Sequence, residues 1–173
     1  MNHPLLGDPA SISALAAALR RTSLTLRADT QHLDAALADA APGWAGPGAA
    51  RVRSRVHDLV SATEAVAAAL DGCSHALQVA AADLATSLAE LRRIEEEAAG
   101  AGLAVRDGTV ERSWGITGLA DAGTESDGDR LRRRLQERVH RTVTTMGRHR
   151  TRLVSECERS SRLLAGAAAA LRS

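Results

Sequence analysis

Apolar side chains recur every three or four residues along most of this chain, and that spacing places them on one face of an α-helix. Between residues 9 and 40 the strongest positions keep a seven-residue step: Ile12, Leu19, Leu26, Leu33 and Ala40, with Leu15 and Leu37 widening the stripe. Asp8 and Pro9 suit the first positions of a helix, and Pro42 and Gly43 suit its end. We therefore expect a first amphipathic helix over residues 9–41.

A second and longer helix is expected from Pro47 to about residue 99, before Gly100 and Gly102. Its apolar positions alternate steps of three and four, as in a coiled-coil seam. They are Ala49, Val52, Val56, Leu59, Thr63, Val66, Leu70, Cys73, Leu77, Ala80, Leu84, Ser87, Leu91, Ile94 and Ala98. At 1.5 Å per residue this helix is roughly 75–80 Å long, against about 50 Å for the first. Residues 81–99 therefore extend beyond the reach of the first helix.

The sequence Trp44-Ala45-Gly46 separates these two helices, in a chain with two tryptophans and no phenylalanine or tyrosine. If the chain folds back at Trp44, facing residues have numbers that add to about 89 and the two apolar stripes meet. Gly46 permits a turn that a side chain would obstruct. Ala40 and Ala49 are small, so we expect the Trp44 indole to close the end of the seam between them.

Residues 100–129 break the helical pattern. Asp107-Gly108 lies between β-branched residues, which is the signal of a two-residue β-hairpin turn. We expect a small β-ribbon there, packed onto a helix by Trp114, and an exposed acidic loop at residues 120–129. Together the patterns predict an all-α fold: an antiparallel helical hairpin over residues 1–99, a linker with this ribbon over 100–129, and a third long helix over 130–173 that packs on the hairpin.

The chain has two cysteines, Cys73 and Cys157, and both fall on apolar stripes. The stripe of the third helix consists of Leu135, Val139, Thr142, Met146, Leu153, Cys157, Leu164 and Leu171. Packed antiparallel to the second helix with residue numbers adding to about 230, it places Cys157 opposite Cys73. Two interpretations remain open: a packed pair of small core residues, or a disulfide in an oxidising compartment.

Charge is unevenly distributed, although the formal net charge is only +1. All 22 basic residues are arginine, and residues 130–172 are strongly basic whereas residues 1–129 are acidic overall. Two clusters occupy unfavourable helix ends: Glu95, Glu96 and Glu97 close the second helix, and Arg132, Arg133 and Arg134 open the third. The helix dipole disfavours each charge at these positions. The antiparallel register brings the clusters together, so they either pair with each other or display the arginines to a partner.

The chain carries no catalytic or cofactor motif, so neither an enzyme activity nor a small-molecule substrate, cofactor or metal is expected. Cys73 and His75 come nearest to a metal site, but they supply only two ligands. No apolar run approaches the roughly 20 residues that span a bilayer, and the N-terminus lacks the pattern of a signal peptide. The arginine-rich helix has no aromatic residue to stack on bases, which leaves phosphate contacts as the basis of a nucleic-acid-binding alternative.

Residues 8–99 resemble the Trp-x-Gly (WXG) helical-hairpin family, the ESAT-like substrates of type VII secretion. The resemblance rests on a helix, Trp44-Ala45-Gly46 at the turn, and a second amphipathic helix that opens with GPGAARVRSRV. It implies an antiparallel hairpin that dimerises into a four-helix bundle, with itself or with a sister protein. It also implies export without a cleaved signal, with the chain cytoplasmic beforehand, and a partnership with a secreted toxin or the secretion machinery.

Two features depart from this family's pattern. Family export signals place a tyrosine, then an acid four residues on, near the end of the second helix, and this chain has no tyrosine. A partner would then have to supply the signal. The third helix is an addition, which either fills the groove of a dimer partner or extends the surface for a cargo protein.

The function expected from the sequence is non-enzymatic protein–protein interaction, as a WXG-like substrate or partner for type VII secretion. Because residues 81–99 extend past the first helix, they are the expected interface, with these contact candidates: Leu84, Leu88, Leu91 and Ile94. The alternatives are an intracellular adaptor coiled coil without a secretion role and an arginine-rich nucleic-acid-binding protein.

Overall fold

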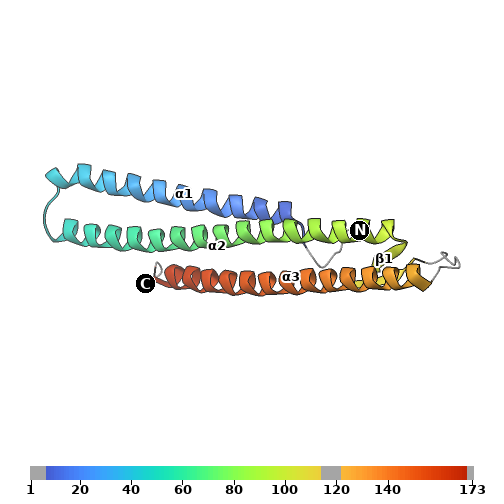
Figure 1. Cartoon of the computed structure of the whole chain (residues 1–173). Helices are drawn as coiled ribbons and strands as arrows, with labels where there is room; N and C mark the ends of the chain where they lie inside the picture. The colour runs from blue at the N-terminus through green and yellow to red at the C-terminus, as the bar shows by residue number, and fades with distance from the viewer. Residues whose placement is uncertain (1–6, 114–121, 171–173) are drawn as a thin grey trace. The chain divides into compact units, whose positions relative to one another are not determined.

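The computed structural model describes residues 7–113 and 122–170 (Figure 1). Its elements are α1 (Pro9–Ala40), a short 3-10 turn (Ala41–Gly43), α2 (Pro47–Gly100), β1 (Leu103–Arg106), β2 (Thr109–Arg112) and α3 (Ala122–Ala170). The predicted fold class is confirmed: three helices, the first two packed as a hairpin, with a two-stranded ribbon between the second and third. Trp114 and Leu171 lie outside the described residues.

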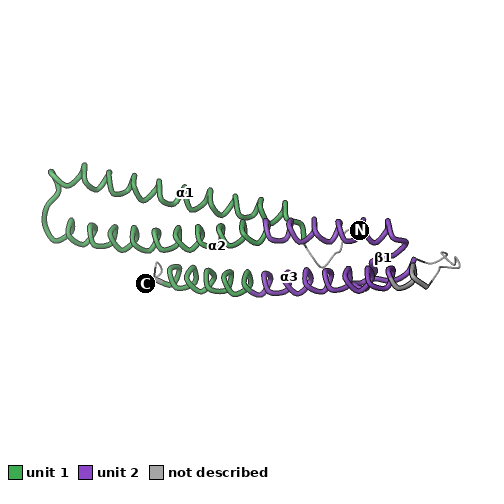
Figure 2. The backbone as a smooth tube through the Cα atoms, in the orientation of Figure 1, with its two compact units in different colours: residues 1–81, 152–173 green, residues 82–151 purple. Residues whose placement is uncertain are grey.

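The chain divides into two compact units, coloured separately in Figure 2. Unit 1 consists of residues 1–81 and 152–173, and unit 2 consists of residues 82–151. Helix α2 contributes one stretch to each unit, and so does helix α3.

The start of α1 is capped by Asp8, as its position before Pro9 predicts. The Asp8 carboxylate accepts hydrogen bonds from the backbone N–H groups of Ala10 (3.2 Å) and Ser11 (3.0 Å) and from the Ser11 hydroxyl (2.7 Å). These bonds, the hydroxyl's above all, lower the pKa of Asp8 because they favour its charged form.

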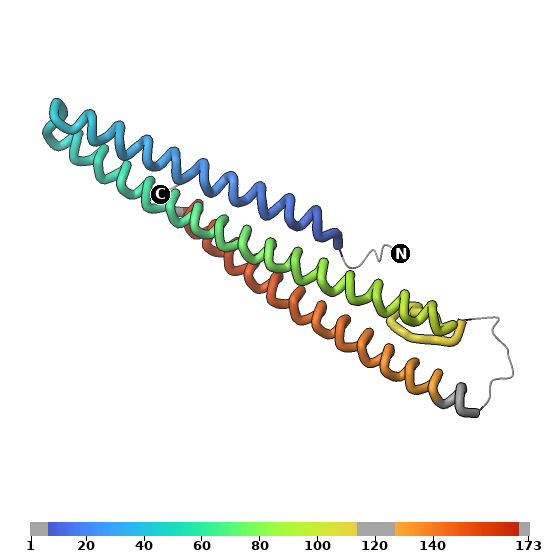
Figure 3. Tube along the Cα trace, turned by 45° about the horizontal axis from the view of Figure 1, so that its top comes forward, coloured from blue at the N-terminus to red at the C-terminus, as the bar shows by residue number. Residues whose placement is uncertain are grey.

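The hairpin of α1 and α2 in unit 1 is antiparallel (Figure 3), and two hydroxyl groups define its register. Ser23 donates to the Ala67 carbonyl and Ser74 donates to the Ala16 carbonyl, each at 2.9 Å. Residue numbers add to 90 in both pairs, against the expected value of about 89 for a coiled-coil seam centred on Trp44. A side-chain hydroxyl can reach the backbone of a neighbouring helix only when small residues let the two helices approach closely.

The residues that line this contact are not the ones the sequence pattern favoured. The buried side chains of α1 are small: Ala16, Ser23 and Thr30. The expected leucine stripe lies beside this line, where Leu19 and Leu26 are half-buried, Leu15 is 52% exposed and Ala40 is exposed. Both lines keep a seven-residue step, so the spacing did not distinguish them. The hydroxyls are tolerated inside because each finds a carbonyl acceptor.

The core of unit 2 joins both helices to the ribbon. Its buried members are Ile94 and Ala98 of α2, Leu103 and Val110 of the ribbon, and Leu135 and Val139 of α3. Four of these belong to the stripes predicted for α2 and α3, and the ribbon adds the other two. The ribbon is therefore an integral part of this core.

The ribbon forms where the Asp107-Gly108 signal predicts it. Its strands pair antiparallel, with Val105 opposite Val110, and both turn residues have positive φ, 48° at Asp107 and 79° at Gly108. A two-residue hairpin turn of this kind requires that backbone conformation.

Gln136 of α3 secures the outer edge of β2. Its side-chain carbonyl accepts from the Val110 N–H at 2.8 Å, and its amide group donates to the Gly108 carbonyl at 2.9 Å. A single glutamine thus satisfies both a donor and an acceptor on the edge of the ribbon, as a third strand would.

The start of α3 differs from expectation. The helix begins at Ala122, so the acidic stretch expected as a loop at residues 120–129 belongs largely to the helix. Asp127 and Asp129 lie inside this helix and pair with Arg130 and Arg132. Within the described parts of the chain, no helix combines the length and apolar character needed to cross a membrane.

Candidate functional site

The turn of the hairpin is built by Gly46, as expected. Its φ of +102° is strained for any residue with a side chain, and Pro47 begins α2 immediately after it. The Trp44 carbonyl accepts a hydrogen bond from the Arg53 guanidinium at 3.3 Å. Both motif residues therefore lie in the connection between α1 and α2.

The Trp44 side chain does not close the seam in the way the sequence suggested. It is 38% exposed, although Ala49 beside it is buried at 1%. Ala40, which was expected to contact the indole together with Ala49, is itself exposed. Trp44 instead presents a large apolar side chain at the surface of the turn.

The expected interface on α2 needs one correction. Ile94 is fully buried, at 0% exposure, in the core that the ribbon and α3 form around it. Leu84, Leu88 and Leu91 are half-buried. The prediction considered only the short reach of α1, whereas the ribbon and α3 also cover this part of α2. Ile94 is therefore a core residue and is unavailable to a partner.

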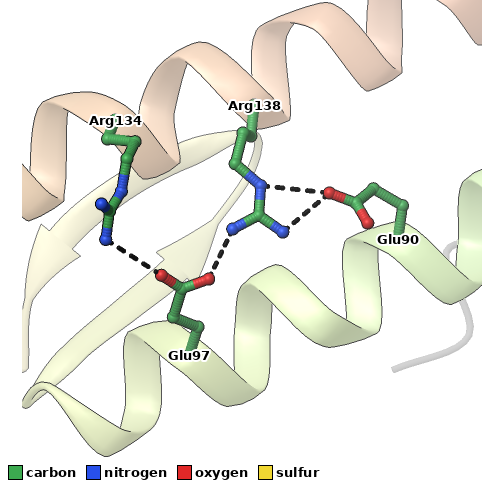
Figure 4. Close-up of polar contacts among 4 residues, drawn as sticks. All are labelled: Glu90, Glu97, Arg134 and Arg138. Carbon is green, nitrogen blue, oxygen red and sulfur yellow. Dashed lines mark hydrogen bonds and ion pairs between the residues drawn. The ribbon is translucent and has the colours of Figure 1, made fainter.

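The strongest polar contacts in unit 2 centre on Arg138 (Figure 4). Its guanidinium donates to Glu90 from Nε at 3.1 Å and from Nη2 at 2.7 Å, and it also pairs with Glu97. The hydrogen bonds to Glu90 and Glu97 raise the pKa of Arg138. The three side chains are 28–38% exposed, so this network is less hydrated than the other arginine–carboxylate pairs described in the unit.

The predicted pairing of the two charged clusters is found for one pair. Arg134 lies 3.4 Å from Glu97. Arg132 pairs instead with Asp129 at 3.7 Å, and Arg133 donates to the Asp129 carbonyl at 3.3 Å. Glu95 and Glu96 are exposed.

Glu90 and Arg138 were missed because the sequence argument considered only runs of like charge. The missing signal was spacing. Glu90 lies seven residues before Glu97, and Arg138 lies four residues after Arg134, so each pair shares a helix face.

A second contact missed from the sequence joins His149 to Asp83. The His149 Nδ1 lies 2.9 Å from an Asp83 carboxylate oxygen, and both side chains are about one-third exposed. Although the distance is short, the buried Nδ1 makes no hydrogen bond of normal geometry. Electrostatic attraction holds this pair only when the histidine is protonated.

The two cysteines of unit 1 face each other from α2 and α3. Both are free thiols and both are half-buried. Burial first, and then the neighbouring Cys73 side chain, raise the pKa of Cys157 because both disfavour its thiolate. Their residue numbers add to 230, which is the register expected from the apolar stripes.

The described residues contain no group of three or more histidine, cysteine, aspartate or glutamate side chains placed to hold a metal ion. His75, the neighbour of the cysteine pair in sequence, is exposed. Comparison with protein-family models, with curated proteins and with solved structures finds no match to this chain.

Proposed function

We propose that this chain is a non-enzymatic protein–protein interaction module, a WXG-like substrate or partner protein of type VII secretion. The observation that carries the proposal is the position of Trp44-Ala45-Gly46 in the connection between α1 and α2, with glycine at a positive φ that a side chain would disfavour. The family that this motif resembles uses the same arrangement, and its hairpins act by binding other helical proteins.

The surface proposed for the partner is the half-buried leucine row of α2 in unit 2, Leu84, Leu88 and Leu91. Positions 84, 88 and 91 follow steps of four and three, so they share one face of the helix. A partner helix that laid its own apolar face on this row would remove the remaining exposed area from water. Ile94 has no part in this surface.

The absence of tyrosine gives the chain a specific role within this proposal. It is the member of a pair that lacks the export signal, and it leaves the cell bound to a helical protein that carries one. A secreted toxin or a second WXG-like protein fits this description. Neither a catalytic step nor a cofactor is required.

The first test is the mass of the full chain in solution, measured by light scattering alone and after co-expression with helical proteins encoded by neighbouring genes. The proposal predicts a stable complex with one of them. Replacing Leu84, Leu88 and Leu91 by serine should abolish that complex. The matched control is Leu163→Ser in unit 1, which changes an apolar side chain that is 58% exposed and should leave the complex intact. A chain that stays monomeric with every neighbour would overturn the proposal.

The main alternative is an intracellular adaptor coiled coil, and the missing tyrosine favours it. An export experiment distinguishes the secretion proposal from the adaptor alternative. The tagged chain, produced in its native host together with its partner, should appear in the medium only when the secretion system is intact. Retention in the cells under both conditions would favour the adaptor. The nucleic-acid alternative predicts retention on a polyanion column that falls steeply with salt.

A further inference from the structure

The cysteine pair of unit 1 has no place in the proposed function. Cys73 lies on the middle part of α2 and Cys157 on the final part of α3, separated by 83 residues of sequence. Figures 2 and 3 both show these two stretches side by side. Each thiol is half-buried, so each packs against the helices while keeping some contact with solvent.

The two side chains also lie close enough for Cys73 to raise the pKa of Cys157. The chain contains no other cysteine, so no third thiol competes for either partner. Two neighbouring thiols on different helices, both partly open to solvent, are an arrangement from which a disulfide can form when an oxidant reaches them.

We propose that Cys73 and Cys157 are a reversible thiol–disulfide site that joins α2 to α3 when the chain meets a low-molecular-weight disulfide such as oxidised glutathione. The inference is independent of the secretion proposal, because it needs no partner protein and no export.

The exchange proceeds in two steps. The Cys73 thiolate attacks one sulfur of oxidised glutathione, forming a mixed disulfide and releasing one glutathione. The Cys157 thiolate then attacks the Cys73 sulfur, forming the bond between the helices and releasing the second glutathione. The protein loses two electrons and two thiol protons, and the glutathione disulfide gains the two electrons and takes up two protons from the solution.

The order of these steps follows from the surroundings of Cys157. Burial and the neighbouring Cys73 raise its pKa, which lowers its thiolate fraction and makes it slow to attack an external disulfide. Once the mixed disulfide is attached to Cys73, its sulfur lies beside Cys157, and proximity offsets the low thiolate fraction. A dithiol reductant reverses both steps.

The test equilibrates the full chain in mixtures of reduced and oxidised glutathione, followed by alkylation of the remaining thiols and measurement of the intact mass. The expected product is a monomer that has lost two hydrogen atoms and cannot be alkylated, in a proportion set reversibly by the glutathione ratio. Disulfide-linked dimers, stable glutathione adducts or two alkylated cysteines at the most oxidising ratio would overturn the proposal.

A matched variant checks the geometry. In the double variant Cys157→Ser/Glu158→Cys, the thiol moves by one residue to a position that is exposed on α3. It should accumulate a glutathione adduct instead of an internal bond, although it has the same number of cysteines. An internal disulfide as abundant as in the unchanged chain would show that the facing geometry is irrelevant.

The disulfide should also raise the temperature at which the chain unfolds. A cross-link that closes so long a loop restricts the unfolded chain, so the oxidised protein should unfold about 10 °C above the reduced protein. Cys73→Ser should unfold at one temperature with or without oxidised glutathione. Equal midpoints for the oxidised and reduced forms of the unchanged chain would contradict a bond between α2 and α3.

Discussion

Single polar side chains control local structure in this molecule through defined hydrogen bonds. Asp8 starts α1, Ser23 and Ser74 connect the two helices of the hairpin, and Gln136 secures the ribbon. Each has a specific acceptor or donor on the backbone. Substitution at these positions should therefore produce larger effects than similar substitutions on the exposed helix faces.

Asp8 gives a pH dependence whose sign follows from its lowered pKa. Its contribution to the start of α1 is fully present above the unfolded value, close to 3.8, and is lost as pH falls through the lower value of the folded state. The shift of the Ser11 amide proton in NMR spectra should titrate below pH 3.8.

Two variants complete this test. Asp8→Asn should keep the cap and lose the titration, whereas Asp8→Ala should speed hydrogen exchange at the first turn of α1 several-fold. A titration at or above the ordinary carboxyl value would contradict the assignment.

Ser23 tests the close contact of the hairpin. Ser23→Ala removes a buried hydrogen bond to the Ala67 carbonyl and should lower the free energy of unfolding by about 1 kcal/mol. The control is Thr22→Ala, which removes an exposed hydroxyl that bonds only within its own helix. Urea unfolding should separate the two variants. Equal stability of both would mean that the hydroxyl between the helices contributes nothing.

At the scale of elements, Arg138 contributes most of the ion pairing between the stretches of α2 and α3 in unit 2. Pairing of the clusters at residues 95–97 and 132–134 with each other contributes only the Arg134–Glu97 pair. Arg138→Met should lower the free energy of unfolding by about 1 kcal/mol, because it leaves Glu90 unpaired and removes one of the two arginines that pair with Glu97, and Arg134→Met should lower it by much less. The difference should shrink in high salt. Thermal unfolding at low and high salt measures it, and a larger effect of Arg134→Met would reverse the ranking.

The elements themselves could be predicted well from the sequence, because each has a local signal. The Asp8-Pro9 start, the glycines at the turns and the Asp107-Gly108 hairpin all lie where backbone chemistry requires them. The buried face of α1 could not be chosen in this way. A line of leucines and a line of small residues had the same period, and only the approach of α2 with its carbonyl groups decides between them.

The candidate site was less predictable for the same reason. Burial of Ile94 depends on the ribbon, whose packing comes from residues distant in sequence. Pairing of Arg138 with Glu90 depends on a register between two helices, whereas the sequence analysis looked for runs of like charge. The cysteine pair was the exception, because the apolar stripes of the two helices, packed antiparallel, were sufficient to align it.

At the scale of the whole molecule, the two units have different interiors. Unit 2 has a cluster of larger apolar side chains, and the hairpin of unit 1 has alanine and serine at its centre. Large-to-small substitutions should therefore be most damaging in unit 2.

Substitution of Ile94 tests whether this residue belongs to the core of unit 2 or to an interface. Ile94→Ala should lower the free energy of unfolding of the isolated chain by about 2–5 kcal/mol, and Leu91→Ala should cost clearly less because Leu91 is half-buried. Denaturant unfolding followed by hydrogen exchange in residues 82–113 would measure both. If the Ile94→Ala chain were as stable as the original, Ile94 would not be a core residue, and its assignment to the interface in the sequence analysis would stand.

The small residues of the hairpin also make its alignment degenerate. Sliding α1 by seven residues along α2, about 10.5 Å, would again place small side chains opposite each other: Ala16 by Ala81, Ser23 by Ser74 and Thr30 by Ala67. Packing alone accepts both alignments in this direction. The connection at residues 41–46 disfavours the second, since the shifted alignment would move the end of α1 away from the start of α2 and would require the 3-10 turn at Ala41–Gly43 to open. The turn thus acts as the spacer that selects one of two permitted alignments, and lengthening it would release the other.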